Sequence, residues 1–146
     1  MSKTIEEFLS PKQEQSVIDA IRISESNTSG EIRVHLENCC SSNPFERAIE
    51  IFSILKMHKT KLRNGVLIYI AVEERAFAIY GDEGINSIVP ENFWDSTKDS
   101  IQSQFIKGDF EQGLMDGVLK VGEQLKQHFP LLDNDQNELS DSISKS

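Results

Sequence analysis

The sequence predicts an α/β protein, a three-layer α/β/α sandwich around a small mixed β-sheet. Three observations support this prediction: alternating apolar and polar side chains over residues 31–37, an uninterrupted apolar run over residues 65–72, and helical apolar spacing before, between and after them. The order strand, helix, strand indicates a right-handed βαβ crossover. A short return strand and C-terminal helices complete the predicted fold.

The first helix is expected to begin at Pro11 and to end near Ser24. Ser10 is a suitable N-cap, Pro11 suits the first helical position, and Gln13 can close a capping box. The polar residues 24–30 end the helix. Its core-facing apolar residues recur at helical spacing: Val17, Ile18 and Ile21.

A strand and a second helix are expected next. In EIRVHLE, residues 31–37, apolar and polar side chains alternate, as in a strand with one face in water. Asn43 and Pro44 can begin a helix, and the basic residues within 56–63 suit its C-terminal end, where the helix dipole is negative. The apolar residues of this helix recur at helical spacing: Phe45, Ala48, Ile49, Phe52 and Leu55.

A β-hairpin is predicted in the middle of the chain. GVLIYIAV, residues 65–72, is apolar on both alternating faces, so we expect a central strand that is covered above and below. Only residues 73–75 separate it from AFAIY, residues 76–80. Because so short a link suits only an antiparallel return, residues 76–80 should form the third strand.

Helices are predicted for most of the remaining chain. A short helical turn should follow Gly84 and stop at Pro90, and a longer helix should come next, marked by Phe93, Trp94, Ile101 and Phe105. Asp109 can cap the last helix, with Gln112 at the capping-box position. The apolar stripe of this helix consists of Phe110, Leu114, Val118, Val121 and Leu125.

The composition fits one domain that binds neither nucleic acid nor membranes. The 146 residues are 38% hydrophobic, which is enough for a single core over residues 1–130. Residues 131–146 are polar, acidic and without periodicity, so we expect a disordered tail there. Asp and Glu number 24 against 15 Lys and Arg, a formal net charge of −9. Such a charge repels phosphate backbones and anionic membranes and favours cations and basic proteins as partners.

Localisation is expected to be cytoplasmic. The N-terminal residues contain no apolar signal-peptide region, and no apolar run approaches the roughly 20 residues that a membrane span needs. We therefore expect a soluble protein that is not exported and does not insert into membranes. The two cysteines, Cys39 and Cys40, are adjacent and fit reduced thiols. A vicinal disulfide acting as a redox switch is the less favoured alternative.

An acidic corner follows the third predicted strand. IYGDEGIN, residues 79–86, places Asp82 and Glu83 between two glycines. If the first two strands are parallel and the third is antiparallel to them, this corner lies beside the N-terminal ends of both, near Glu31 and Asn64. Carboxylate, amide and backbone oxygens there are the ligands that Ca²⁺ and Mg²⁺ prefer.

A plain turn in which Asp82 only caps the following helix is the alternative to a cation site. Arg63 lies close to the corner in this topology and argues against a cation, unless the arginine binds an anionic ligand.

Three segments follow one another over roughly residues 28–128: TSGEIRVHL, LRNGVLIYIAVEERAFAIYGDEGI and FIKGDFEQGLMDGV. Taken in order, they resemble the TPM domain family, which occurs in thylakoid-lumen proteins, an acetylcholine-receptor modulator and many bacterial proteins. The resemblance implies an α/β/α sandwich around a mixed sheet and divalent cation binding, especially of calcium. Acid phosphatase activity, as in some plant members, is also implied. By motif position, the acidic features of the family fall on Glu31, the Gly81 to Gly84 turn, Glu91 and Asp109. Many relatives carry an Asp after the glycine turn, where this chain offers only Glu91.

Three functions remain open from the sequence. The first is a divalent cation module with Asp82 as the anchor ligand, further carboxylates from Glu83, Glu31 or Glu91, and Asn64 with loop carbonyls completing the shell. The second is a metal-dependent phosphatase at the same cluster, because only a metal with its carboxylates could activate water in a chain without a nucleophile elbow, a Walker loop or an HExxH pair. The third is a structural or interaction module whose acidic face meets a basic protein.

Overall fold

A computed structural model gives the structure of the chain and describes residues 5–131 and 142–146. The elements of the described chain, in order, are α1 (Ile5–Phe8), α2 (Pro11–Glu25), β1 (Glu31–Glu37), α3 (Pro44–Ile54), β2 (Gly65–Ala71), β3 (Ala76–Gly81), α4 (Glu83–Asn86), α5 (Asp95–Ile106), α6 (Phe110–His128) and β4 (Ser144–Lys145). No helix within this described part is both long enough and apolar enough to cross a membrane.

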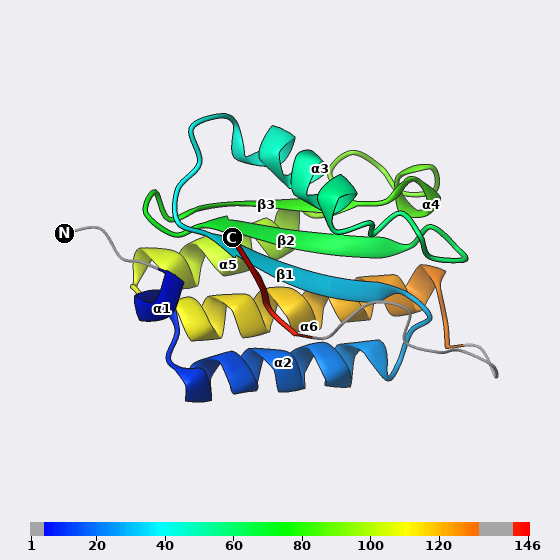
Figure 1. The fold of residues 1–146 in the computed structure, drawn as a ribbon. Helices are drawn as coiled ribbons and strands as arrows, with labels where there is room; N and C mark the ends of the chain where they lie inside the picture. Colours follow the sequence, from blue (N-terminus) through cyan, green and yellow to red (C-terminus); the bar gives the residue numbers. More distant parts are fainter. Residues whose placement is uncertain (1–4, 132–141) are drawn as a thin grey trace.

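The four strands of the described chain form one mixed sheet in the order β3-β2-β1-β4 (Figure 1). β1 and β2 are parallel, with Glu31 opposite Gly65 at their first residues. β3 returns antiparallel to β2, so that Gly81 pairs with Val66. The predicted α/β fold, a βαβ crossover followed by a hairpin, is therefore confirmed.

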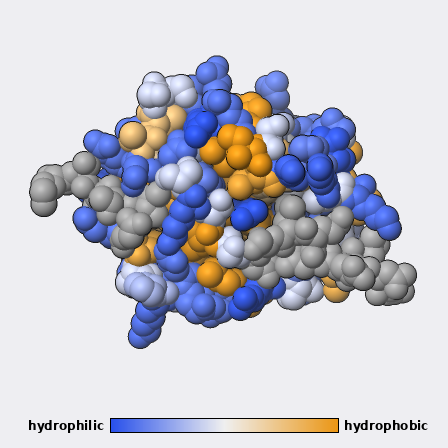
Figure 2. Space-filling view, in the orientation of Figure 1, coloured by the Kyte–Doolittle hydropathy of each residue, from blue (hydrophilic) through white to orange (hydrophobic). Residues whose placement is uncertain are grey.

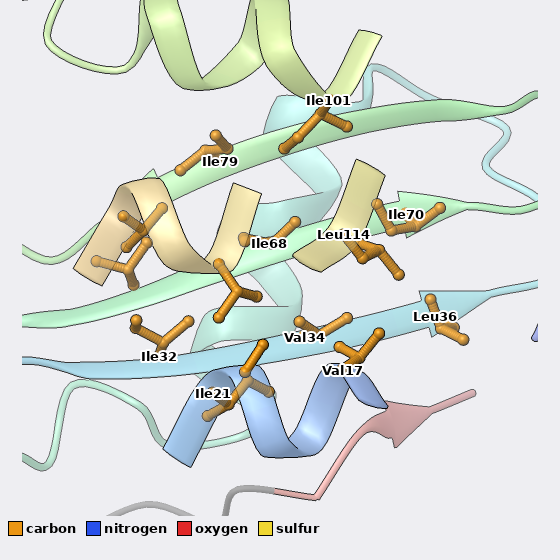
Figure 3. Packing of buried hydrophobic residues seen from close by; sticks show 14 of the residues in the cluster. Val17, Ile21, Ile32, Val34, Leu36, Ile68, Ile70, Ile79, Ile101 and Leu114 are labelled. Carbon is orange, nitrogen blue, oxygen red and sulfur yellow. The ribbon is translucent and has the colours of Figure 1, made fainter. Parts of the chain in front are cut away.

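Helices cover both faces of the sheet and make the predicted three layers. α3 lies on one face, and α2, α5 and α6 lie on the other (Figure 1). The larger core lies between the sheet and the three-helix layer, where Val34 of β1 meets Val17 and Ile21 of α2 (Figure 3). A smaller core lies under α3 and includes Phe52 and Tyr69. All seven residues of β2 are buried, as expected for a central strand.

The predicted caps begin two of the main helices. Ser10 Oγ accepts a hydrogen bond from Gln13 N at 3.1 Å, and Ser10 N donates to Gln13 Oε1 at 2.8 Å, which closes the capping box of α2. Asn43 Oδ1 accepts from the backbone N–H groups of Phe45 and Glu46 and caps α3. These bonds satisfy N–H groups that a helix start otherwise leaves without partners.

The outer surface of α3 is less polar than that of a typical solvent-exposed helix. Phe45, Ile49 and Ile54 of this helix are exposed. The surrounding surface is mostly hydrophilic, and apolar atoms gather in the region of α3 (Figure 2).

The end of the chain differs from the predicted disordered tail. Ser144–Lys145 forms β4, which pairs in parallel with β1 so that His35 lies opposite Ser144. A strand of two residues is too short to show a periodic pattern. Its conformation depends on pairing with the edge of β1. The rest of the predicted tail, residues 132–141, lies outside the described residues.

Candidate functional site

Two backbone hydrogen bonds join the ends of three strands at the edge of the sheet where β1 and β2 begin and β3 ends. Glu31 N donates to Asn64 O at 3.3 Å, and Asp82 N donates to Gly65 O at 2.9 Å. Because Asn64 and Gly65 are consecutive, the acidic corner lies beside the entrance of β2, which lies beside the entrance of β1. The structure therefore brings together the strand ends that the sequence placed there.

The Asp82 carboxylate is buried and has two partners. Arg63 Nε donates to Oδ2 at 2.8 Å and Arg63 Nη2 donates to Oδ1 at 2.9 Å, a bidentate ion pair. Oδ1 also accepts from Glu83 N at 2.7 Å, so Asp82 caps α4 as well. The hydrogen bonds to Asp82 raise the pKa of the Arg63 guanidinium.

Glu83 extends the same ion pair into solvent. Its Oε1 accepts from Arg63 Nη1 at 3.0 Å, and its side chain is exposed. One guanidinium thus bridges two carboxylates at the position that a cation between Asp82 and Glu83 would take. The structure therefore confirms that Arg63 lies beside the acidic corner, which the sequence analysis gave as an argument against a cation there.

Gly84 brings loop carbonyls to this corner. Its N–H donates to Arg63 O at 2.9 Å. A Cβ atom at Gly84 would lie 2.3 Å from Leu62 O and 2.5 Å from Arg63 O, so no larger residue fits without a shift of the backbone. The glycine is needed here for close approach of two chain segments, and its φ angle is not the reason.

Two buried polar side chains lie at the entrances of β1 and β2. The exposed fractions of Glu31 and Asn64 are 3% and 1%, against 2% for Asp82. Asn64 Nδ2 has no hydrogen-bond acceptor among the residues that the structure describes. A half turn of the amide exchanges its nitrogen and oxygen, so the same side chain can present an acceptor oxygen to a cation.

The other two predicted ligands, Glu91 and Asp109, lie in a turn and at the start of a helix. Glu91 is exposed in the turn after Pro90. Asp109 caps α6, with its Oδ1 accepting from Gln112 N at 3.1 Å. The next residue, Phe110, lies under the guanidinium of Arg75, which belongs to the β2–β3 turn at the opposite end of the hairpin. Asp109 is therefore at the opposite end of the strands, and it caps α6 as the sequence predicted.

No preformed metal centre is present in the described part of the chain. Within residues 5–131 and 142–146, no group of three or more His, Cys, Asp or Glu side chains is placed to hold a metal ion.

Comparison with known proteins identifies the family. A family model for the TPM domain matches residues 4–124. This chain belongs to the TPM domain family.

Three solved structures share the fold. The NMR structure of the BA42 protein from the psychrophilic bacterium Bizionia argentinensis is 53% identical, with a TM-score of 0.91, and the match covers 98% of this chain and 99% of that one. The N-terminal domain of a protein from P. gingivalis is 21% identical, with a TM-score of 0.68 and coverage of 84% and 79%. The N-terminal domain of the cg2496 protein from Corynebacterium glutamicum is 17% identical, with a TM-score of 0.55 and coverage of 77% and 68%. No curated protein matches the chain.

A second polar cluster in this TPM domain was not found from the sequence. Glu37, at the end of β1, accepts two hydrogen bonds of 2.9 Å from Arg47 and one of 2.8 Å from the Tyr69 hydroxyl. The hydrogen bonds from Arg47, together with those from Ser146 and Tyr69, lower the pKa of Glu37 to about 2. Burial, followed by the hydrogen bond to Glu37, raises the pKa of Tyr69.

The prediction that one side of β1 faces water is therefore wrong, because Glu31 and His35 are buried and Arg33 and Glu37 are partly buried. His35 and Glu37 are covered by residues from α3, β2 and β4. The alternation of EIRVHLE was a correct signal for a strand, but it could not reveal partners that lie 10 to 111 residues away in the sequence. A polar pocket of about 410 Å³ opens beside this cluster, and its walls include the free thiols of Cys39 and Cys40.

Proposed function

We propose that this TPM domain binds a divalent cation, Ca²⁺ or Mg²⁺, at the strand edge formed by Glu31, Asn64 and Asp82. The observation that carries the proposal is the burial of these three polar side chains at one sheet edge, where two backbone hydrogen bonds hold the strand ends together. Carboxylate and amide oxygens gathered at one place are the ligands that a hard cation takes.

The donors at this edge suit such a cation. Asp82 would be the anchor ligand, Glu83 and Glu31 would add carboxylate oxygens, and Asn64 would add its amide oxygen. The carbonyls of Leu62 and Arg63, held close by Gly84, are further oxygen donors. Ca²⁺ takes about six to eight oxygen ligands and tolerates irregular geometry, so it fits this mixed set better than Mg²⁺, which demands a near-ideal octahedron.

Arg63 acts in this proposal as a built-in competitor. Its guanidinium must leave Asp82 and Glu83 before a cation can bind between them. The Arg63 side chain is 39% exposed, so it has solvent into which it can move. Because a bidentate pair must break first, we expect a modest affinity, with a dissociation constant on the order of 10⁻⁴ to 10⁻³ M.

A metal-dependent phosphatase is the second candidate, and it depends on the first. Once displaced, Arg63 would present the same three N–H donors to a phosphate that it now presents to two carboxylates. The cation would supply the chemistry, by lowering the pKa of bound water. Phosphate release that needs added Ca²⁺ or Mg²⁺ and stops in Asp82→Asn would support this activity.

Calcium titration followed by amide NMR shifts tests the cation site. The proposal predicts saturable shifts that cluster at residues 28–31, 63–65 and 81–84. Asp82→Asn is the informative variant, since asparagine is also a good N-cap for α4, whereas the charge and one of the two acceptor oxygens are lost. Glu111→Gln, which removes a charge from the first turn of α6, is the matched control. Shifts spread evenly over the domain, or equal affinities for the two variants, would refute the proposal.

A further inference from the structure

The edge of β1 that lies away from β2 is occupied by the last residues of the chain (Figure 1). Ser144–Lys145 pairs in parallel with His35 and Leu36, and Ser146 N donates to Leu36 O at 3.0 Å. A strand edge has unpaired N–H and C=O groups that can pair with any extended peptide. The two-residue pairing therefore covers a potential peptide-binding edge.

His35 makes this edge selective for hydroxyl side chains. It is only 2% exposed, and both ring nitrogens contact serine hydroxyls, Nδ1 with Ser144 Oγ at 2.9 Å and Nε2 with Ser146 Oγ at 2.8 Å. The Ser146 hydroxyl donates to Glu37 Oε2 at 2.8 Å, so its oxygen must accept from Nε2–H. Nδ1 is then the acceptor for the Ser144 hydroxyl. The neutral ring thus matches one hydroxyl as donor and one as acceptor.

The opposite face of the short strand β4 lies toward α2 and makes different contacts. Successive side chains of a strand point to opposite faces, so Lys145 points away from His35. Its Nζ lies 2.5 Å from Glu14 Oε1 of α2. Ile143 packs against the main hydrophobic core. The occupied edge therefore contacts an apolar, hydroxyl, basic, hydroxyl sequence, and each of the four side chains has its own partner.

We propose that the β1 edge of this TPM domain is a docking site for an extended segment of a partner protein with the pattern apolar, Ser or Thr, Lys or Arg, Ser or Thr, and that residues 143–146 are its displaceable internal occupant. The site is separate from the strand edge at Asp82 and does not depend on cation binding. A basic residue in the partner also suits the net charge of −9 of this chain.

An added peptide must compete with residues 143–146, which already occupy the site. A segment of the same chain competes at an effective concentration on the order of millimolar when its connection is short. A free peptide should therefore bind weakly to the wild-type domain. Removing the side-chain contacts of the internal segment, while leaving His35, Glu37 and Glu14 in place, should expose the site.

The test uses the full chain and a synthetic peptide of sequence SISKS. In the triple variant Ser144→Ala, Lys145→Glu, Ser146→Ala, the peptide should bind about tenfold or more tightly than in the wild type, because its competitor is weakened. NMR amide shifts should be centred on residues 35–37. The control peptide SIAKA, which lacks both hydroxyls, should bind about tenfold more weakly than SISKS, since it leaves the ring nitrogens of His35 without partners.

A second variant tests the site from the protein side without disturbing the core. Glu14→Gln in the triple-variant background should weaken SISKS binding severalfold, whereas Asp19→Gln, further along α2 on its exposed face, should not. Equal binding of SISKS and SIAKA, shifts centred elsewhere, or no binding to the triple variant would each overturn the proposal.

Discussion

Gly84→Ala should destabilise the domain far more than a methyl group added to its neighbour in the same corner. The new Cβ would lie 2.3 Å from Leu62 O and 2.5 Å from Arg63 O, and both atoms belong to the backbone, so no side chain can rotate away. The corner must open, and the 2.9 Å hydrogen bond from Gly84 N to Arg63 O is strained or lost. Overpacking of about 1–3 kcal/mol together with one hydrogen bond gives an expected loss of about 2–4 kcal/mol in the free energy of unfolding.

Gly81→Ala is the matched control for this prediction. A Cβ at Gly81 would lie 3.4 Å from Trp94 Cζ2 and 3.5 Å from Ile85 Cγ2, which is ordinary packing distance. We expect a change of less than about 1 kcal/mol, because no backbone atom needs to move. Urea unfolding of both variants at neutral pH measures the difference. Equal midpoints for Gly81→Ala and Gly84→Ala would show that the close approach of residues 62–63 to the corner is not as described.

Two further predictions concern the polar face of β1. Burial lowers the pKa of His35 to about 4. As the pH falls below 6.5, the unfolded chain therefore binds a proton at this histidine before the native protein does. The free energy of unfolding should fall by roughly 2–3 kcal/mol as the pH is lowered from 6.5 to 4. Urea unfolding at pH 7, 6 and 5 measures this loss of stability. The His35→Gln variant should lose the pH dependence between pH 6.5 and 5. A wild-type free energy of unfolding that stays constant over that range would contradict the prediction. Arg47→Met removes the bidentate partner of Glu37 and should destabilise the domain by about 2–3 kcal/mol, with a rise in the pKa of Glu37 measurable from carboxyl NMR shifts. An unchanged Glu37 pKa in that variant would mean that Arg47 does not hold the carboxylate.

The elements that were predicted correctly are those with local signals. The capping box from Ser10 to Gln13 and the apolar run of β2 depend on neighbours a few residues apart, so the sequence alone contains the relevant physics. The meeting of strand ends at Asp82 also followed, because the hand of a βαβ crossover and the direction of a hairpin leave one arrangement. The backbone geometry of the candidate site could therefore be predicted from the sequence.

Side-chain pairing was not accessible in the same way. Whether Arg63 points at Asp82 or into solvent depends on the loop before β2, whose path no periodic pattern fixes. The burial of His35 depends on a strand more than 100 residues later in the chain. For Asp109, a motif match suggested a ligand, whereas the local cap signal gave the position that the structure has.

The measurement that tests the proposed cation site most directly is the calcium affinity of Arg63→Gln against that of Arg22→Gln, determined by isothermal titration calorimetry. Both substitutions remove one positive charge, but only Arg63 pairs with Asp82, while Arg22 lies beside Asp19 on the exposed face of α2. We predict that Arg63→Gln binds Ca²⁺ about tenfold or more tightly than the wild type, because the competing guanidinium is gone, and that Arg22→Gln differs little from it. Equal affinities for the two variants, or no binding by Arg63→Gln, would contradict the assignment of a cation to this edge of the sheet.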